Sequence, residues 1–148
     1  MLRLSLVGMN PKKLQETSYG VIPLKKVAAQ WQVLLIQMNA GHWSFPKGHP
    51  EIGESALETA RRELFEETRL SISRVLVEVP FEENYQFTKN TNLINKKVFY
   101  FLAEVSGNVT VQKEEIQAFK WISPIDAINS LTFLEDKILF KQILFFLS

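Results

Sequence analysis

The sequence predicts an α/β fold, namely an α/β/α sandwich in which helices cover both faces of a mixed β-sheet. Strand-type segments lie both before and after one central amphipathic helix, and further helical segments close the chain. The 148 residues contain no long polar or Pro/Gly-rich linker. We therefore expect one domain over residues 1–148.

The first predicted elements are two strands over residues 19–24 and 31–37. Both segments are rich in β-branched, aliphatic and aromatic residues. The polar Lys25–Lys26 region separates them, and the pattern indicates a β-hairpin with its link in that region. Residues 39–53 then bring together Gly, Pro, His and Asn, a composition typical of a loop.

A helix is predicted after this loop, beginning near Glu54 and Ser55 and ending near Leu70. Ser55 and Glu58 have the spacing of a capping box, which satisfies free backbone N–H groups at a helix start. One helical stripe is apolar and is expected to face the core; it consists of Ala56, Leu57, Ala60 and Leu64.

The rest of the chain predicts strands over residues 72–87, 98–105 and 118–122. Pro124 is placed to open a short helix, because proline is well tolerated in a first helical turn. A last helix is predicted over residues 133–147. Its expected core face consists of Phe133, Leu134, Ile138, Leu139, Ile143 and Leu144.

Composition narrows the classes of function. The formal net charge of +1 gives no broad basic surface for a nucleic-acid backbone, whereas a small anionic substrate is compatible. Without cysteine, a metal ion must bind to oxygen or histidine. The apolar run in residues 1–9 is too short for a signal peptide, and no stretch has the length of a transmembrane helix, so we expect a cytoplasmic protein.

The chemistry is concentrated between Gly48 and Leu70. Glu54 follows Gly48 after five residues, and the run Arg62-Glu63-Leu64-Phe65-Glu66-Glu67 follows after seven more. On a helix, Glu63, Glu66 and Glu67 project from one face, where their like charges repel. An ordinary solvated helix face would show such charges too, but a divalent cation would remove the repulsion, and carboxylates suit Mg²⁺ or Mn²⁺.

The spacing over residues 48–70 resembles the Nudix box, G-x5-E-x7-R-E-U-x-E-E-x-G-U with U apolar. Every fixed position matches except the last glycine, which is Arg69 here. A glycine just beyond a helix end usually supplies a left-handed backbone conformation. Arg69 is less suited to that conformation, but it replaces no metal ligand. The resemblance implies a Nudix-type fold with a mixed sheet.

The same resemblance implies roles for the catalytic group Glu54, Arg62, Glu63, Glu66 and Glu67. The last three glutamates would bind the metal, together with the backbone carbonyl of Gly48. Arg62 would pair with Glu54 and so hold the loop against the helix. Which glutamate deprotonates water stays open, because coupled carboxylates share their titration.

Segments outside the box resemble diadenosine tetraphosphate hydrolases of the asymmetrical type, namely residues 41–49, 96–104 and 115–121. This resemblance implies cleavage of a dinucleoside polyphosphate to ATP and AMP by attack of water, with Mg²⁺ as the cofactor. It also suggests Glu115 as a further metal ligand, although the neighbouring Glu114 is an alternative.

Five residues are candidates for binding the substrate: His42, Lys47, Tyr85, Lys96 and Phe119. Tyr85 and Phe119 would stack on adenine or pack in the core, and the two lysines would hold phosphates or only solubilise the surface. His42 would contact the phosphate chain or be structural. Two rival functions are a Nudix hydrolase acting on RNA 5′ ends and a Nudix module that binds nucleotides without cutting them. The oligomeric state is left open.

Overall fold

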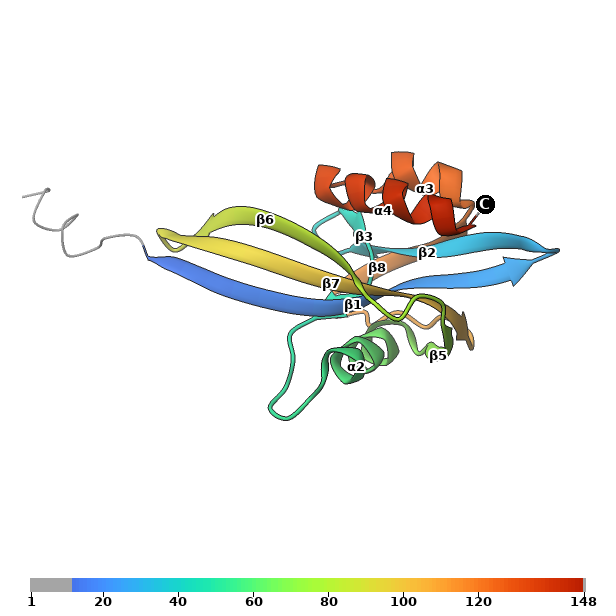
Figure 1. Ribbon diagram of the computed structural model, residues 1–148, viewed down its shortest axis with the longest axis horizontal. Helices are drawn as coiled ribbons and strands as arrows, with labels where there is room; N and C mark the ends of the chain where they lie inside the picture. The colour runs from blue at the N-terminus through green and yellow to red at the C-terminus, as the bar shows by residue number, and fades with distance from the viewer. Residues whose placement is uncertain (1–11, 148) are drawn as a thin grey trace, which may run out of the picture.

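In the computed structural model, described residues run from 12 to 147. The expectation about a signal peptide concerns residues 1–9 and lies outside this range. The sheet forms the middle layer, with helix α2 (Ala56–Thr68) on one face and helices α3 (Pro124–Ser130) and α4 (Leu134–Leu147) on the other (Figure 1). This arrangement confirms the predicted α/β/α sandwich.

The sheet is mixed, because one strand pair is parallel and the other pairs are antiparallel. Its two long strands, β1 (Lys13–Val27) and β7 (Asn92–Ser106), run parallel to each other over most of their length. Strand β2 (Gln30–Met38) pairs with the other side of β1 and continues the sheet to β8 (Ile116–Ile122). The order β3-β2-β1-β7-β5 places β1 at the centre.

The hairpin between β1 and β2 forms as predicted, but its turn lies further along the chain. Lys25 and Lys26 pair with residues of β2 and so belong to the strand. The turn is Ala28–Ala29, and both residues have positive φ values, 52° and 65°. Positive φ at both central residues suits the twist of a two-residue hairpin, whatever the polarity of its side chains.

The strand expected over residues 72–87 is two strands, β5 (Ser71–Val75) and β6 (Phe81–Lys89). Both pair with β7, but with opposite ends of it, so the chain must leave the sheet between them. Pro80 stands at the second boundary, where it donates no ladder hydrogen bond. The expected loop 39–53 contains two further short strands, β3 (Trp43–Ser44) and β4 (Lys47–Gly48).

The sheet divides the core into two parts. Helix α2 (Ala56–Thr68) packs Ala60 and Leu64 against one face, as its apolar stripe predicts. Helices α3 (Pro124–Ser130) and α4 (Leu134–Leu147) cover the other face with Ala127, Leu139, Phe140 and Ile143. Pro124 occupies the first turn of α3, as expected.

The core face of α4 differs from the prediction. Phe133, Leu134 and Ile138 are exposed, whereas Leu139, Phe140 and Ile143 are buried. The helix is apolar around most of its circumference, so periodicity does not define which side meets the sheet. Across residues 12–147, no helix combines the length and the hydropathy that crossing a bilayer requires.

Candidate active site

The ends of helix α2 are defined by local hydrogen bonds. Ser55 accepts a hydrogen bond from the backbone N–H of Glu58, and the Glu58 carboxylate accepts one from the N–H of Ser55, so the predicted capping box is present. At the other end, Arg69 has the left-handed conformation, with φ 66°. The helix keeps its glycine-type cap even though the residue there is arginine.

Arg62 joins the loop before α2 to the helix. Its guanidinium donates to Glu54 at 2.6 Å and 3.0 Å, and to the backbone carbonyl of His49 at 2.9 Å. The hydrogen bonds from Arg62 are the main reason that the pKa of Glu54 falls to about 2. The expected Arg62–Glu54 bridge is therefore present as a two-point contact, which holds the loop in one geometry.

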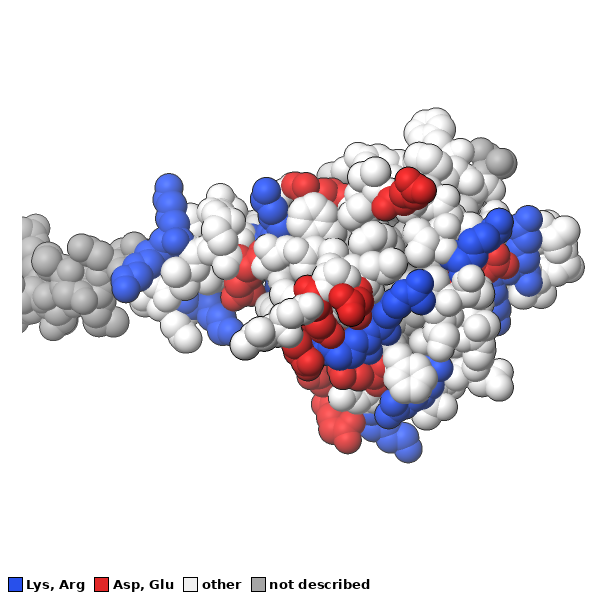
Figure 2. Space-filling model, turned by 60° about the horizontal axis from the view of Figure 1, so that its bottom comes forward, with Lys and Arg blue, Asp and Glu red and all other residues white. Residues whose placement is uncertain are grey.

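The same guanidinium also reaches two of the three clustered carboxylates. It donates to Glu63 at 2.9 Å and to Glu66 at 3.2 Å. Figure 2 shows acidic side chains gathered on the face of the molecule that carries α2, with basic side chains beside them. Arg62 thus offsets part of the repulsion within the cluster, and it also orients Glu63.

Glu63, Glu66 and Glu67 lie on one face of the helix, but their side chains differ in solvent exposure. Glu66 is largely exposed, with 47% of its side chain accessible, whereas Glu67 is only 4% exposed. Burial, together with its hydrogen bond to Glu63, raises the pKa of Glu67 to about 9. Glu67 Oε2 has no hydrogen-bond partner in residues 12–147. This side chain therefore keeps an oxygen free to bind a ligand.

Gly48 lies against Glu63 at the start of the loop. Strand β4 pairs with β1 and so brings the Gly48 backbone directly onto the Glu63 carboxylate. A β-carbon at position 48 would overlap that carboxylate. Only glycine leaves room there, so the backbone at position 48 lies close to the Glu63 carboxylate.

These groups form an oxygen donor set that fits a hard cation. Within the described range, no three His, Asp or Glu side chains converge into a ready-made metal cage. Mg²⁺ does not need one, because it keeps several waters and is typically held by one or two carboxylates together with substrate phosphates. The free oxygen of Glu67 and its crowding by Glu63 match that requirement.

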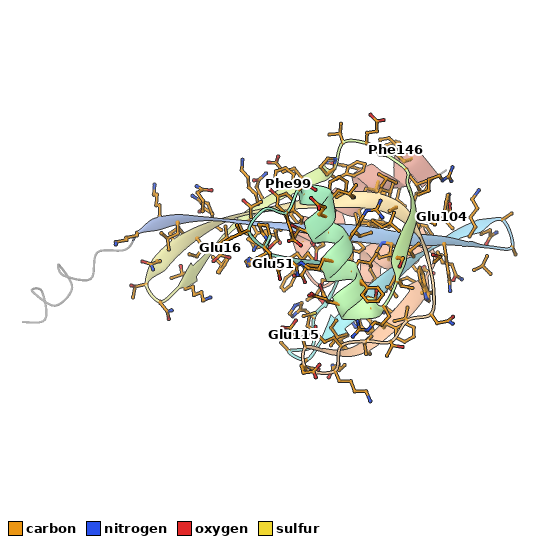
Figure 3. All side chains as sticks on the ribbon, turned by 90° about the horizontal axis from the view of Figure 1, so that it is seen from below. Glu16, Glu51, Phe99, Glu104, Glu115 and Phe146 are labelled. Carbon is orange, nitrogen blue, oxygen red and sulfur yellow. The ribbon has the colours of Figure 1, made fainter. Side chains whose placement is uncertain are left out.

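The segment before β8 lies beside the C-terminal end of α2. Backbone N–H groups of Thr110 and Gln112 donate to the carbonyls of Thr68 and Glu67. Figure 3 shows Glu115 near that end of the helix. The charge of Glu115 contributes to the raised pKa of Glu67. Glu115 is thus close to the carboxylate cluster, although its side chain is exposed.

A cleft of about 270 Å³ opens beside Glu67. It unites residues from distant parts of the chain, including six candidates from the sequence: His42, Lys47, Gly48, Glu67, Tyr85 and Lys96. Lys96 is buried and donates to Ser18 at 2.7 Å, so its ammonium group has a defined position. Burial lowers the pKa of Lys96. Burial also lowers the pKa of His42, and the positive charge of Lys47 lowers it as well.

A second hollow of about 330 Å³ adjoins the cleft and shares Lys47, Tyr85 and Phe87 with it. Phe133 also lines this hollow, and its ring lies 5.0 Å from that of His42. The sequence predicts Phe133 on the core face of a helix over residues 133–147. The helix instead begins at Leu134, and Phe133 is exposed beside the hollow.

Phe119 lies outside both the cleft and the adjoining hollow. It is on β8, paired with Ile36 of β2, and its side chain is exposed. Neither the cleft nor the hollow is lined by it. Stacking of Phe119 on a base stays a prediction, whereas Phe133 lines the hollow together with Tyr85 and Phe87.

The chain is similar in sequence and fold to known proteins. A model of the NUDIX domain matches residues 17–142. The asymmetrical bis(5′-nucleosyl)-tetraphosphatase of Rattus norvegicus is 39% identical over 112 residues, which cover 72% of this chain and 74% of the rat protein.

Two further similar proteins are named for different substrates, one for Ap4A and one for RNA. The crystal structure of a C. elegans Ap4A hydrolase binary complex has a TM-score of 0.69 and 25% identity, and the match covers 89% of this chain and 97% of that one. The RNA pyrophosphohydrolase of Bartonella bacilliformis is 31% identical over 97 residues, covering 55% of this chain and 57% of its own.

Proposed function

Because this chain belongs to the Nudix hydrolase family, we propose that it hydrolyses diadenosine tetraphosphate asymmetrically to ATP and AMP. The family relation gives the coarser activity, pyrophosphohydrolysis of a nucleotide. One observation supports the finer proposal: a cleft lined by Lys47, Lys96 and Glu67 continues into a hollow with aromatic walls. A long polyphosphate with a nucleoside at its end matches that shape and charge.

The carboxylates would hold the metal. Glu63, Glu66, Glu67 and the Gly48 carbonyl would bind Mg²⁺, or Mn²⁺ in its place, with Glu115 completing the set from the segment before β8. When bound, the cation would neutralise phosphate charge and lower the pKa of a coordinated water. Arg62 and Glu54 would act by position, since their contacts hold the loop and Glu63 in place.

The basic residues of the cleft would hold the phosphate chain. Lys96 is suited to this because burial and its bond to Ser18 restrict its ammonium group. Lys47 lines both hollows and would contact phosphates at their junction. The lowered pKa of His42 favours a neutral imidazole, which still donates one hydrogen bond to a phosphate oxygen.

The hollow beside the cleft would bind adenosine. Tyr85 and Phe133 both line it, and any aromatic face stacks on a base. The base that removes a proton from water stays open among the glutamates. Balanced hydrolysis requires only that one water adds across one phosphoanhydride bond, which leaves ATP and AMP as the two products.

The test is to incubate the purified protein with diadenosine tetraphosphate in isotopically labelled water, with and without Mg²⁺, and to identify the products by mass spectrometry. We expect ATP and AMP only when the metal is present. Glu67→Gln should lower kcat at least about a hundredfold, since metal catalysis contributes several kcal/mol. Glu78→Gln, at an exposed loop position, is the matched control.

Other outcomes would redirect the proposal. Two ADP molecules would contradict asymmetrical cleavage. No turnover of the dinucleotide, but release of pyrophosphate from triphosphorylated RNA, would favour the RNA-end activity. Binding without turnover of either substrate would favour a nucleotide-binding module, although such a module would have no need for like charges on one helix face.

A further inference from the structure

The hollow beside the catalytic cleft contains a second pair of acidic side chains, distinct from the Nudix-box carboxylates. Glu83 comes from β6 and Asp136 from the first turn of α4. Only 7% of Glu83 and 4% of Asp136 is exposed, and both line the hollow with Tyr85, Phe87 and Phe133. Burying two carboxyl groups in a core this size is costly unless each finds a partner.

The two groups share one proton. Burial, together with its hydrogen bond to Asp136, raises the pKa of Glu83 to about 9. Burial also raises the pKa of Asp136, but there the same hydrogen bond acts in the opposite direction. Near neutral pH, Glu83 is therefore protonated and donates to Asp136. The oxygens left over can only accept hydrogen bonds.

An acceptor remains unused at this position. Glu83 Oε2 is buried and has no hydrogen-bond partner in residues 12–147. Lys47 lines the same hollow, but no ion pair joins it to either carboxyl group in that range. An unused buried acceptor instead calls for a donor on the ligand.

The side chains that line the hollow indicate which kind of ligand supplies this hydrogen-bond donor. Three aromatic side chains, Tyr85, Phe87 and Phe133, line the hollow and favour a flat heterocycle, and Lys47 connects the hollow to the phosphate cleft. Of the groups on an adenine ring, the exocyclic amino group donates, while the ring nitrogens accept. An amino group on a base held among these rings would lie in the same hollow that the Glu83 and Asp136 carboxyl groups line.

We propose that Glu83 and Asp136 recognise the exocyclic amino group of an adenine base bound in the hollow. The proposal rests on the proposed function in one respect, namely that a nucleotide base enters this hollow. It adds a residue pair that determines base specificity. Replacing both acids with leucine should preserve the fold, because a buried polar pair can often be exchanged for apolar residues of similar volume.

The test measures binding without catalysis. ATP and the triphosphate of purine riboside, which lacks only the amino group, are titrated by calorimetry in the absence of divalent metal. We expect wild-type protein to bind ATP roughly tenfold more tightly or better, as loss of a hydrogen bond to a charged group implies. Glu83→Leu/Asp136→Leu should bind both ligands alike. Glu82→Gln, exposed on the same strand, should keep the wild-type preference.

Three outcomes would overturn the proposal: equal affinities in wild-type protein, a preference that survives in the double variant, or no binding of either nucleotide. Thermal unfolding of the double variant checks that its fold persists, and Glu83→Gln provides a milder change if it does not. Failure of the proposed function is separate, because it appears as absent turnover of the dinucleotide. A protein that prefers ATP in this titration but cuts another adenine nucleotide would support the base-recognition pair alone.

Discussion

Glu67 carries a carboxyl group that is both buried and close to another carboxylate, and both features disfavour its ionised form. It is buried against the core side of α2, beside Glu63, and its pKa is raised to about 9. A buried carboxylate without a counter-charge destabilises the folded state, so the chain gains nothing from this arrangement by itself. A divalent cation at Glu67 would relieve the conflict, which is why the least accessible of the three glutamates is the strongest candidate ligand.

Glu115 and Glu114 are neighbours, and Glu115 is among the main causes of the raised pKa of Glu67. We therefore predict that Glu115→Gln raises the Mg²⁺ concentration for half-maximal activity by about tenfold, as loss of a metal-site carboxylate commonly does. Glu114→Gln should leave that concentration unchanged. Activity measured across a magnesium titration checks both variants, and the opposite ranking would assign the ligand to Glu114.

Phe133 and Phe119 are both exposed aromatic residues, but only Phe133 lines the hollow that contains Tyr85. Base stacking contributes about 1–3 kcal/mol per base, so Phe133→Ala should raise KM for the dinucleotide at least about fivefold. Phe119→Ala is the matched control and should leave KM unchanged. Steady-state kinetics decide between them, and a raised KM for the Phe119 variant alone would restore that residue as the stacking partner.

At the scale of elements, helix α2 is held by contacts at its two ends. The capping box at Ser55 and the Arg62 bridge to Glu54 come from residues within a short stretch of chain. These interactions involve no residue of the sheet, and the Arg62 contacts orient the Glu63 carboxylate. The C-terminal end is the weaker one, because Arg69 adopts a conformation that glycine would adopt without strain.

Arg69→Gly is accordingly predicted to stabilise the protein. Relief of the left-handed conformation contributes about 1 kcal/mol. Loss of the guanidinium contact over the Phe65 ring, at 5.1 Å, costs about 0.5 kcal/mol. The free energy of unfolding should rise by about 0.5 kcal/mol, measured by urea denaturation.

Arg61→Gly supplies the control, because Arg61 is exposed in the interior of the same helix. Glycine there should lower the free energy of unfolding by about 1 kcal/mol. If both glycine variants were equally destabilised, strain at the helix end would not be the reason for the Arg69 effect.

At the scale of the whole molecule, the two buried acids Glu67 and Glu83 make the free energy of unfolding decrease as the pH rises. The folded-state pKa of Glu83 is about 9, well above its ordinary value of 4.5. Between these values the folded protein holds a proton at Glu83 that the unfolded chain has released. The free energy of unfolding must then fall as pH rises through this window, and the stabilisation is complete only below its lower end.

We predict that the melting temperature of wild-type protein falls between about pH 6 and about pH 9, and that Glu83→Gln makes this fall shallower. The charged groups around Glu83 are Asp136 and Glu135 on α4 and Lys47 on β4. The two acids disfavour its ionisation and the lysine favours it. Differential scanning calorimetry provides the comparison, with Glu82→Gln as the exposed control. Parallel curves for wild type and Glu83→Gln would show that Glu83 is not the titrating group.

Motif spacing and periodicity predict the parts of the molecule that depend on nearby residues. The position of α2, its capping box and the Arg62–Glu54 bridge follow from residues within a few turns of one another, and the sandwich architecture follows from the order of strand and helix patterns along the chain. Most of the cleft candidates were also identifiable, because His42, Lys47 and Gly48 adjoin the motif. These features are determined by the sequence because their partners are close along the chain.

Tertiary structure decided the rest. The buried face of α4, the division of residues 72–87 into two strands and the exposure of Phe133 depend on what packs against them from elsewhere. Glu83 and Asp136 meet only because β6 and α4 lie against each other, and no local pattern marks them as a pair. Burial converts acidic residues of ordinary appearance into a proton-sharing pair and a candidate metal ligand, and burial is a property of the packed molecule rather than of any segment.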